Sequence, residues 1–117
     1  MFAALSTSFT RGPSYMPAPA PHEPDIFRQH RVIAAVVDLL GIPRRELLGA
    51  NQTKSHVRGR WALMHVLRSL GWSSPQIGRA LGNRDHTTVL YGVSRAESLL
   101  ATDAEFAALV RRIEAVL

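Results

Sequence analysis

Glycine interrupts the apolar pattern of this chain at four places, Gly41, Gly49, Gly71 and Gly82. In the segment before each of them, apolar side chains recur every three or four residues, which is the spacing of an amphipathic helix. A glycine just past the last apolar residue is a common helix stop, because it adopts the left-handed backbone conformation without strain. No segment shows the apolar–polar alternation of a strand. The pattern predicts an all-α domain of five or six helices.

The expected helices differ in how much of their surface is apolar. Residues 57–70 carry apolar side chains on most sides, so this helix is expected to be central and the most buried. A short helix around residues 43–48 precedes it, and Ser73 with Gln76 has the spacing of a capping box that begins the next helix. In the first helix, the face expected to point inward is Ile26, His30, Ile33, Val37 and Leu40. In the helix that begins with Asn83 or Asp85 as its N-cap, it is Val89, Val93, Ala96 and Leu100. In the last helix, which Asp103 caps, it is Phe106, Leu109, Val110, Ile113 and Leu117.

The N-terminal segment has a different composition. Five of the seven prolines lie in residues 1–24, among Ser, Thr, Ala and Gly. Such a segment buries too little apolar surface to offset the entropy lost on ordering. We therefore expect a disordered Pro-rich tail over residues 1–24 and a folded domain over residues 25–117.

The positive charge of the chain is concentrated in its middle. The net charge is +5, and residues 40–95 contain nine Arg or Lys against two acidic residues, a net +7. A basic centre with slightly acidic flanks favours a polyanionic partner. The chain has no Cys, which excludes disulfides, thiolate zinc sites and Cys nucleophiles. It also has no long apolar run and no secretory signal pattern, so we expect a cytoplasmic protein.

Enzymatic activity is not expected. The histidines form no H-x-x-x-H pair and have no carboxylate at ligand spacing, which argues against a metal site. Asp85 and His86 are adjacent, so on a helix their side chains point about 100° apart, and no nucleophile elbow accompanies them. No G-x-x-x-x-G-K-[ST] motif occurs, so no nucleotide cofactor is assigned.

The stretch "IGRALGNRDHTTVLYGV", residues 77–93, joins two helical patterns through a short turn that contains Gly82. Two helices joined in this way are typical of a helix-turn-helix, whose second helix places its N-terminal residues in the DNA major groove. Arg can bond guanine, Asp can accept from cytosine, and a Thr methyl can contact a thymine methyl. Alternatively, these polar residues only cap a helix. The basic centre favours the DNA interpretation, and the residues offered to the groove are Arg84, Asp85, His86, Thr87 and Thr88.

This stretch resembles the C-terminal DNA-binding domain (domain IV) of the bacterial replication initiator DnaA, whose signature runs Ile-Gly-x-x-Phe-Gly-Gly-Arg-Asp-His-Thr-Thr-Val. The resemblance extends less tightly from about residue 26 to residue 117, through "IPRRELLG" and "RGRWALMHVL". It implies binding of double-stranded DNA at short A/T-rich boxes, by a module that is monomeric alone, lacks the ATPase domain and acts at the nucleoid. The implied role is regulation of replication initiation at an origin or of transcription.

The resemblance also implies roles for single residues. Asp85, His86, Thr87 and Thr88 match its major-groove readers, and Ser74 and Pro75 match residues that contact a thymine methyl and the nearby backbone. Arg68 matches a phosphate-binding residue, and Arg58 and Arg60 match the basic pair that opens the long helix. The full set of expected DNA-binding residues is Lys54, Arg58, Arg60, Arg68, Ser74, Pro75, Arg84, Asp85, His86, Thr87 and Thr88.

The chain departs from the family pattern before the long helix. The family has a basic connector there, with an arginine that reaches into the minor groove. Here the connector reads "NQTKS", with Gln52 near the position of that arginine and Lys54 as its cation. The turn "LGWSSP" is also one residue shorter. Two alternatives therefore stay open: a module that kept the fold and binds a protein, or a remnant that binds DNA non-specifically. A further partner, such as the initiator itself, would bind through the tail.

Overall fold

The computed structural model describes residues 26–117, and the tail expected over residues 1–24 lies outside the described residues. The described chain folds into α1 (Ile26–Leu40), α2 (Arg44–Leu47), α3 (Lys54–Ser69), α4 (Ser74–Ala80), α5 (His86–Thr102) and α6 (Ala104–Glu114). No strand occurs in this part of the chain. The all-α class and the six helices confirm the sequence-based expectation.

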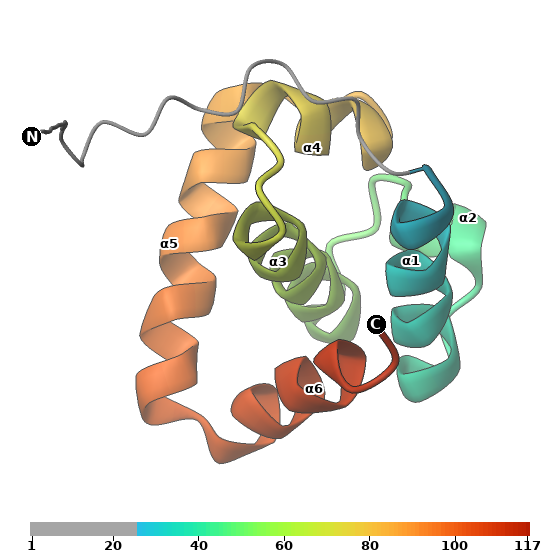
Figure 1. The fold of residues 1–117 in the computed structure, drawn as a ribbon. Coiled ribbons are helices and arrows are strands. Elements are labelled where there is room, and N and C mark those ends of the chain that lie inside the picture. The colour runs from blue at the N-terminus through green and yellow to red at the C-terminus, as the bar shows by residue number, and fades with distance from the viewer. Residues whose placement is uncertain (1–25) are drawn as a thin grey trace, which may run out of the picture.

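Helix α3 lies at the centre of the molecule and contacts all five other helices (Figure 1). In the view of Figure 1, α5 and α1 lie on either side of it, while α4 and α6 cross at the top and the bottom. The prediction that this helix is central and the most buried is confirmed. It contributes the largest share of the fully or nearly fully buried side chains, namely Ala62, Leu63, Met64, Val66 and Leu67.

The helix ends follow the local signals in the sequence. The Ser73 hydroxyl accepts a hydrogen bond from the Gln76 backbone N–H at 3.3 Å, and the Gln76 side chain accepts from the Ser73 N–H at 2.9 Å, which completes the predicted capping box. Asp103 caps α6 by accepting from the backbone N–H groups of Glu105 and Phe106 at 3.0 and 3.2 Å. Both caps were predictable because their donors and acceptors lie within three residues of one another.

Some of the predicted inward faces were wrong at the ends of helices. Ile26 is 52% exposed, and His30 is also exposed, because the buried side chains of α1 all lie between Val32 and Val36. Leu117 is 40% exposed, since α6 ends at residue 114. The long helix begins three residues earlier than predicted, so that Lys54 belongs to its first turn.

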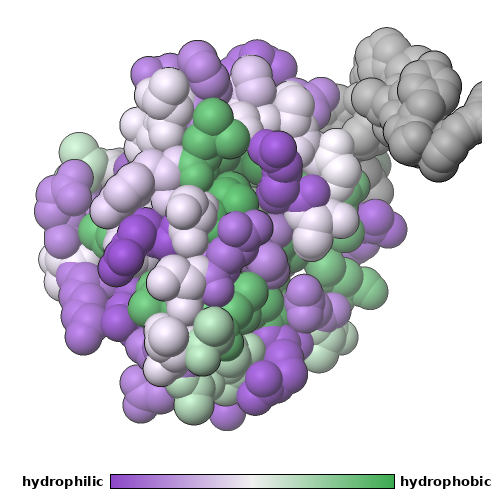
Figure 2. All heavy atoms as spheres, turned by 90° about the vertical axis from the view of Figure 1, so that its left-hand side faces the viewer, coloured by the Kyte–Doolittle hydropathy of each residue, from purple (hydrophilic) through white to green (hydrophobic). Residues whose placement is uncertain are grey.

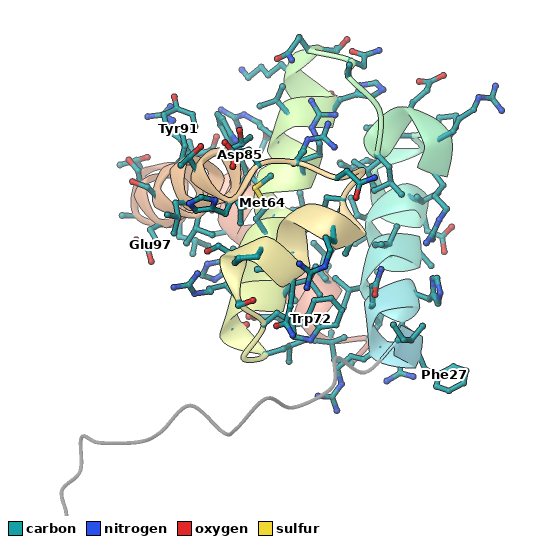
Figure 3. All side chains as sticks on the ribbon, turned by 90° about the horizontal axis from the view of Figure 1, so that it is seen from above. Phe27, Met64, Trp72, Asp85, Tyr91 and Glu97 are labelled. Carbon is teal, nitrogen blue, oxygen red and sulfur yellow. The ribbon has the colours of Figure 1, made fainter. Side chains whose placement is uncertain are left out.

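The two tryptophans differ in burial. Trp72, in the turn after α3, is 4% exposed and belongs to the core, whereas Trp61 is only partly buried (Figure 3 labels Trp72). None of the described helices is long and apolar enough to cross a membrane.

Candidate nucleic-acid interface

A tight turn sets the start of α5 against α4. The Arg84 backbone N–H donates to the Gly78 carbonyl at 2.8 Å, and a Cβ atom added to Gly78 would overlap the Arg84 carbonyl oxygen. Gly82 and Asn83 both have positive φ angles, of 83° and 60°. Glycine adopts such angles without strain, and asparagine tolerates them better than most residues do. The turn therefore positions the first residues of α5 through backbone contacts.

The first turn of α5 is exposed and polar. Asp85, His86, Thr87 and Thr88 are all exposed, and Asp85 marks the start of the helix in Figure 3. Although Asp85 occupies the N-cap position, its side chain makes no capping hydrogen bond. It accepts from the Thr87 hydroxyl at 2.8 Å instead and lies 3.2 Å from His86 Nδ1. The first backbone N–H groups of α5 therefore lack a side-chain cap, and such groups can bind an anion.

The hydrogen bond from Thr87 has an electrostatic consequence. It holds the pKa of Asp85 below its usual range, with a smaller contribution from the neighbouring His86. A carboxylate that stays ionised is an acceptor only, so it can accept from an amino group such as N4 of cytosine but cannot donate.

Two predicted DNA-binding arginines donate to carbonyl groups of the fold, Arg60 from a buried position and Arg84 from a half-buried one. The Arg60 side chain, 5% exposed, donates to the Leu47 carbonyl at 3.2 Å and to the Asn51 carbonyl. The Arg84 guanidinium donates to the Leu48 carbonyl at 3.1 Å and to the carbonyls of Gly49 and Leu81. Burial lowers the pKa of both residues, and the charge of Arg84 lowers that of Arg60 further. Both arginines therefore attach the segment between α2 and α3 to the rest of the domain.

The remaining basic residues lie nearer the surface. Lys54, the first residue of α3, is exposed, as is Arg68, which donates to the hydroxyl of Ser74. That hydroxyl is turned inward, since Ser74 is 6% exposed, while the neighbouring Pro75 is exposed. The structure thus brings Arg68 next to the start of α4.

Arg58 is also engaged within the domain. It forms an ion pair with Asp103, and this hydrogen bond is the main reason why the pKa of Asp103 is lowered. The pair links the first turns of α3 to the joint between α5 and α6. The Arg58 side chain stays 26% exposed, so part of its charge still reaches the surface.

The connector between α2 and α3 has an ordered local structure. The Asn51 side chain accepts from the backbone N–H of Thr53 at 2.8 Å and from the Thr53 hydroxyl. Gln52 is exposed between them. A residue at position 52 is therefore presented to solvent from a backbone that both neighbours hold in place.

Figure 2 shows the side of the molecule on which α5 lies, where hydrophilic side chains surround smaller hydrophobic patches. Trp61, Tyr91 and Arg95 were not among the expected DNA-binding residues, yet they lie together at the contact of α3 and α5. Tyr91 is 61% exposed, and its ring meets Trp61 edge-on, with centroids 6.2 Å apart. Arg95 lies over the same Trp61 ring. A signal was present, because Tyr91 and Arg95 follow Thr87 by four and eight residues and so share its helix face.

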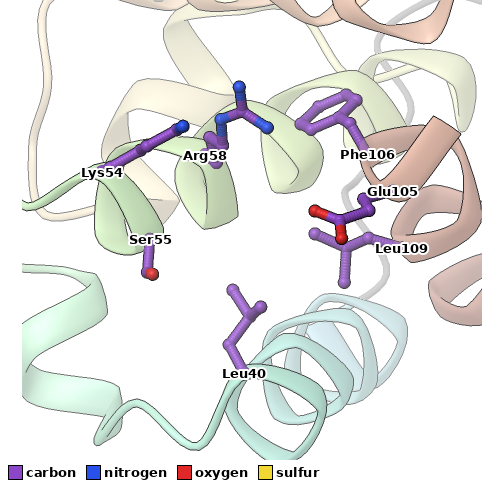
Figure 4. A pocket seen from close by; sticks show the side chains of 7 residues that line it. All are labelled: Leu40, Lys54, Ser55, Arg58, Glu105, Phe106 and Leu109. Atoms are coloured by element: carbon purple, nitrogen blue, oxygen red, sulfur yellow. The ribbon is translucent and has the colours of Figure 1, made fainter. Parts of the chain in front are cut away.

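A pocket of about 250 Å³ lies between α1, α3 and α6 (Figure 4). Lys54 and Arg58 line one side of it, and Glu105 with apolar side chains lines the other. Its mixed charge does not favour a polyanion. Among the described residues, no three His, Asp or Glu side chains are grouped as metal ligands would be.

A short capped helix, a tight glycine turn and a second helix with an exposed polar start define a helix-turn-helix domain. Residues 30–96 match the family described as the bacterial dnaA protein helix-turn-helix. The match covers more than half of the chain, and the chain belongs to this family.

Curated relatives extend the match. The chain is 37% identical over 83 residues to the chromosomal replication initiator protein DnaA of Thermus thermophilus, a match that covers 70% of this chain and 19% of that protein. It is 40% identical over 73 residues to that of Ruegeria pomeroyi, covering 62% of this chain and 16% of the relative. For Rhodopseudomonas palustris the identity is 36% over 85 residues, covering 72% and 18%. The chain thus spans about a fifth of the length of these relatives.

Proposed function

We propose that this domain binds double-stranded DNA sequence-specifically at DnaA-box-like sites, with the start of α5 in the major groove, and that binding involves no catalytic step. The observation that carries the proposal is the exposed, uncapped first turn of α5, with Asp85, His86, Thr87 and Thr88 on a backbone fixed by the Gly78–Arg84 contact. In helix-turn-helix proteins these positions meet the base edges.

The proposed readers are organised before any DNA arrives. Thr87 donates its hydrogen bond to Oδ2 of Asp85, so that Oδ1 is not bonded to Thr87. The carboxylate accepts from a base amino group, and the methyl groups of Thr87 and Thr88 contact thymine methyls. Pro75, exposed at the start of α4, adds an apolar contact beside them.

The proposed backbone anchors are Lys54, Arg58 and Arg68, which lie at or near the surface and neutralise phosphates. In this proposal Arg60 and Arg84 support binding from within, because their guanidinium groups are occupied by carbonyls of the fold. They hold the α2–α3 connector at a fixed position relative to α5.

The relatives are named chromosomal replication initiators, and the proposal places this domain in replication initiation through occupancy of related sites. Its effect is the control of initiation at an origin, or of transcription near such sites.

The test is a titration of labelled duplexes with and without a DnaA-type box at about physiological salt. Specific complexes are typically at least ~10³-fold tighter than non-specific ones. Equal affinity for the box and a scrambled duplex would contradict the proposal and favour a non-specific remnant. Absence of binding to either duplex would favour the protein-interaction alternative.

A further inference from the structure

Trp61, Tyr91 and Arg95 form a surface cluster, called here the Trp61 cluster, that the base-reading proposal does not use. The Tyr91 ring meets the Trp61 ring at an angle of 71°. The Arg95 guanidinium carbon lies 5.4 Å from the centroid of the Trp61 ring, within the range of a cation–π contact. The two contacts hold an exposed phenol and an exposed guanidinium beside one indole.

Gly92 makes this cluster possible. A Cβ atom at position 92 would overlap the sulfur of Met64 and lie 2.9 Å from Trp61 Cδ1. Glycine therefore lets α5 approach α3 closely enough to bring its neighbours alongside Trp61. This accounts for a glycine inside a helix, where it is intrinsically less favourable than alanine.

A pocket of about 320 Å³ adjoins the cluster and is lined by Gln52, Lys54, Val57, Arg58, Trp61 and Arg95. Three of its lining residues are cationic and none is acidic, in contrast to the pocket that contains Glu105. Arg58 shares its charge with Asp103, whereas neither Lys54 nor Arg95 forms an ion pair within residues 26–117. The pocket therefore offers an anion two cations, Lys54 and Arg95, that have no carboxylate partner within residues 26–117.

The location of the pocket indicates the kind of anion that it would bind. Tyr91 and Arg95 continue the face of α5 that begins with Thr87, and the pocket also includes Gln52 of the connector. If the start of α5 enters a groove of a duplex, the DNA backbone that borders this groove would run along this face.

We propose that the pocket and the Trp61 cluster together bind one phosphate of the DNA backbone, on the strand that borders the groove entered by α5. Arg95 and Lys54 supply the charge, the Tyr91 hydroxyl donates a hydrogen bond, and Trp61 holds Arg95 in place. This inference rests on the proposed function and adds a phosphate contact beyond those of the helix-turn-helix and of Arg68.

The first test compares Arg95→Gln with wild type on the box duplex over a series of salt concentrations. Each neutralised phosphate contributes about 0.9 to the slope of log K against log salt. Arg95→Gln should make the slope shallower by about that amount and leave the ratio of box to scrambled affinity unchanged. The matched control is Arg31→Gln, an exposed arginine on α1, which lies on the other side of α3 from α5 (Figure 1). The control should keep the wild-type slope.

The second test uses Trp61 as a probe, since Trp72 is nearly fully buried and Trp61 is the more accessible indole. Bound duplex should protect Trp61 fluorescence from quenching by acrylamide. A slope for Arg95→Gln equal to that of Arg31→Gln, or duplex binding without protection, would overturn the inference while the box preference of the wild-type chain stands. Protection by an acidic peptide such as poly-glutamate but not by duplex would also overturn it and place a protein on this surface. A wild-type chain that binds no duplex would overturn the inference and the proposed function together.

Discussion

The arginine side chains of this domain differ in what they contact. Arg84 directs its guanidinium at carbonyls of the fold, whereas Arg68 is exposed and donates to the hydroxyl of Ser74. A guanidinium can bind several carbonyls because its planar fork donates in several directions at once. The residue type alone therefore does not show whether an arginine binds carbonyls of the fold or stays exposed at the surface.

Replacement of Arg84 by lysine tests its role. Arg84→Lys keeps the charge but cannot reach the carbonyls of Leu48, Gly49 and Leu81 together. Hydrogen bonds from charged groups contribute about 1.5–3 kcal/mol, so the free energy of unfolding should fall by roughly that amount in urea denaturation. Affinity for the box should fall with no change in the salt slope. A shallower slope with unchanged stability would mean that Arg84 contacts phosphate. Arg79→Lys, at an exposed position of α4, is the control.

At the scale of elements, two glycines permit close contacts of different stiffness. At Gly78 an added methyl group would overlap a backbone atom, the Arg84 carbonyl oxygen, while at Gly92 it would meet mainly the side chain of Met64. Alanine favours the helix by about 1 kcal/mol at either site. We expect Gly78→Ala to lower the free energy of unfolding by about 1–3 kcal/mol, the usual range for overpacking, and by more than Gly92→Ala.

Thermal unfolding of the two glycine variants side by side measures this difference. The Gly78 variant should also bind the box more weakly, because the start of α5 has to move to make room. If Gly78→Ala is as stable as wild type and binds the box equally well, the turn is not set by this contact.

The ion pair between Arg58 and Asp103 should make the joint of α5 and α6 sensitive to acid. The hydrogen bond from Arg58, followed by that from the Phe106 N–H, holds the pKa of Asp103 below its usual range. A carboxylate with a lowered folded-state pKa stabilises the fold fully above its unfolded value of about 3.9, and the effect is lost as pH falls through the lower, folded value. Wild type should therefore be more stable than Asp103→Asn at pH 7, and this difference should shrink below about pH 4.

Urea denaturation of both proteins across this pH range measures the effect. Asparagine is an equally good N-cap, so the variant isolates the charge of Asp103 from its capping role. A stability difference that stays constant from pH 7 to pH 3 would contradict the assignment.

Local patterns in the sequence predicted these elements better than their contacts. The capping box of Ser73 and Gln76 and the cap of α6 by Asp103 depend on residues three or fewer positions apart, so the sequence contains them directly. The inward turn of Arg60 and Arg84 depends on carbonyls as far as 36 residues away in the chain. Likewise, the burial of Trp72 and the partial burial of Trp61 depend on how α3 packs, and no local pattern reports that.

At the scale of the whole molecule, the connector between α2 and α3 is held in a fixed position relative to α5. Arg84 joins them, so a residue at position 52 has a defined location relative to α5. Narrow A/T-rich minor grooves attract arginine strongly. At position 52 this chain has a glutamine instead of an arginine. We therefore expect it to read the major-groove half of a box better than the A/T-rich half.

Introducing an arginine at position 52 tests this expectation. Gln52→Arg should raise affinity by about 1 kcal/mol, roughly one hydrogen bond, mainly on duplexes whose A/T tract is intact. Binding curves for wild type and Gln52→Arg on boxes with and without the tract measure the gain. Equal gains on both duplexes would mean that the new arginine contacts only phosphate, and no gain on either would place the connector away from the groove.

The most direct measurement of the central claim, that the start of α5 reads bases, is the ratio of box to scrambled affinity in three variants at one stated salt concentration. Asp85→Ala and Thr87→Ala should each weaken box binding by about 1–3 kcal/mol, with little effect on the scrambled duplex, so that the ratio falls. Arg68→Ala should weaken both duplexes alike, keep the ratio and make the salt slope shallower by about one unit. If Arg68→Ala changes the ratio while Asp85→Ala and Thr87→Ala leave it at the wild-type value, the first turn of α5 does not read DNA.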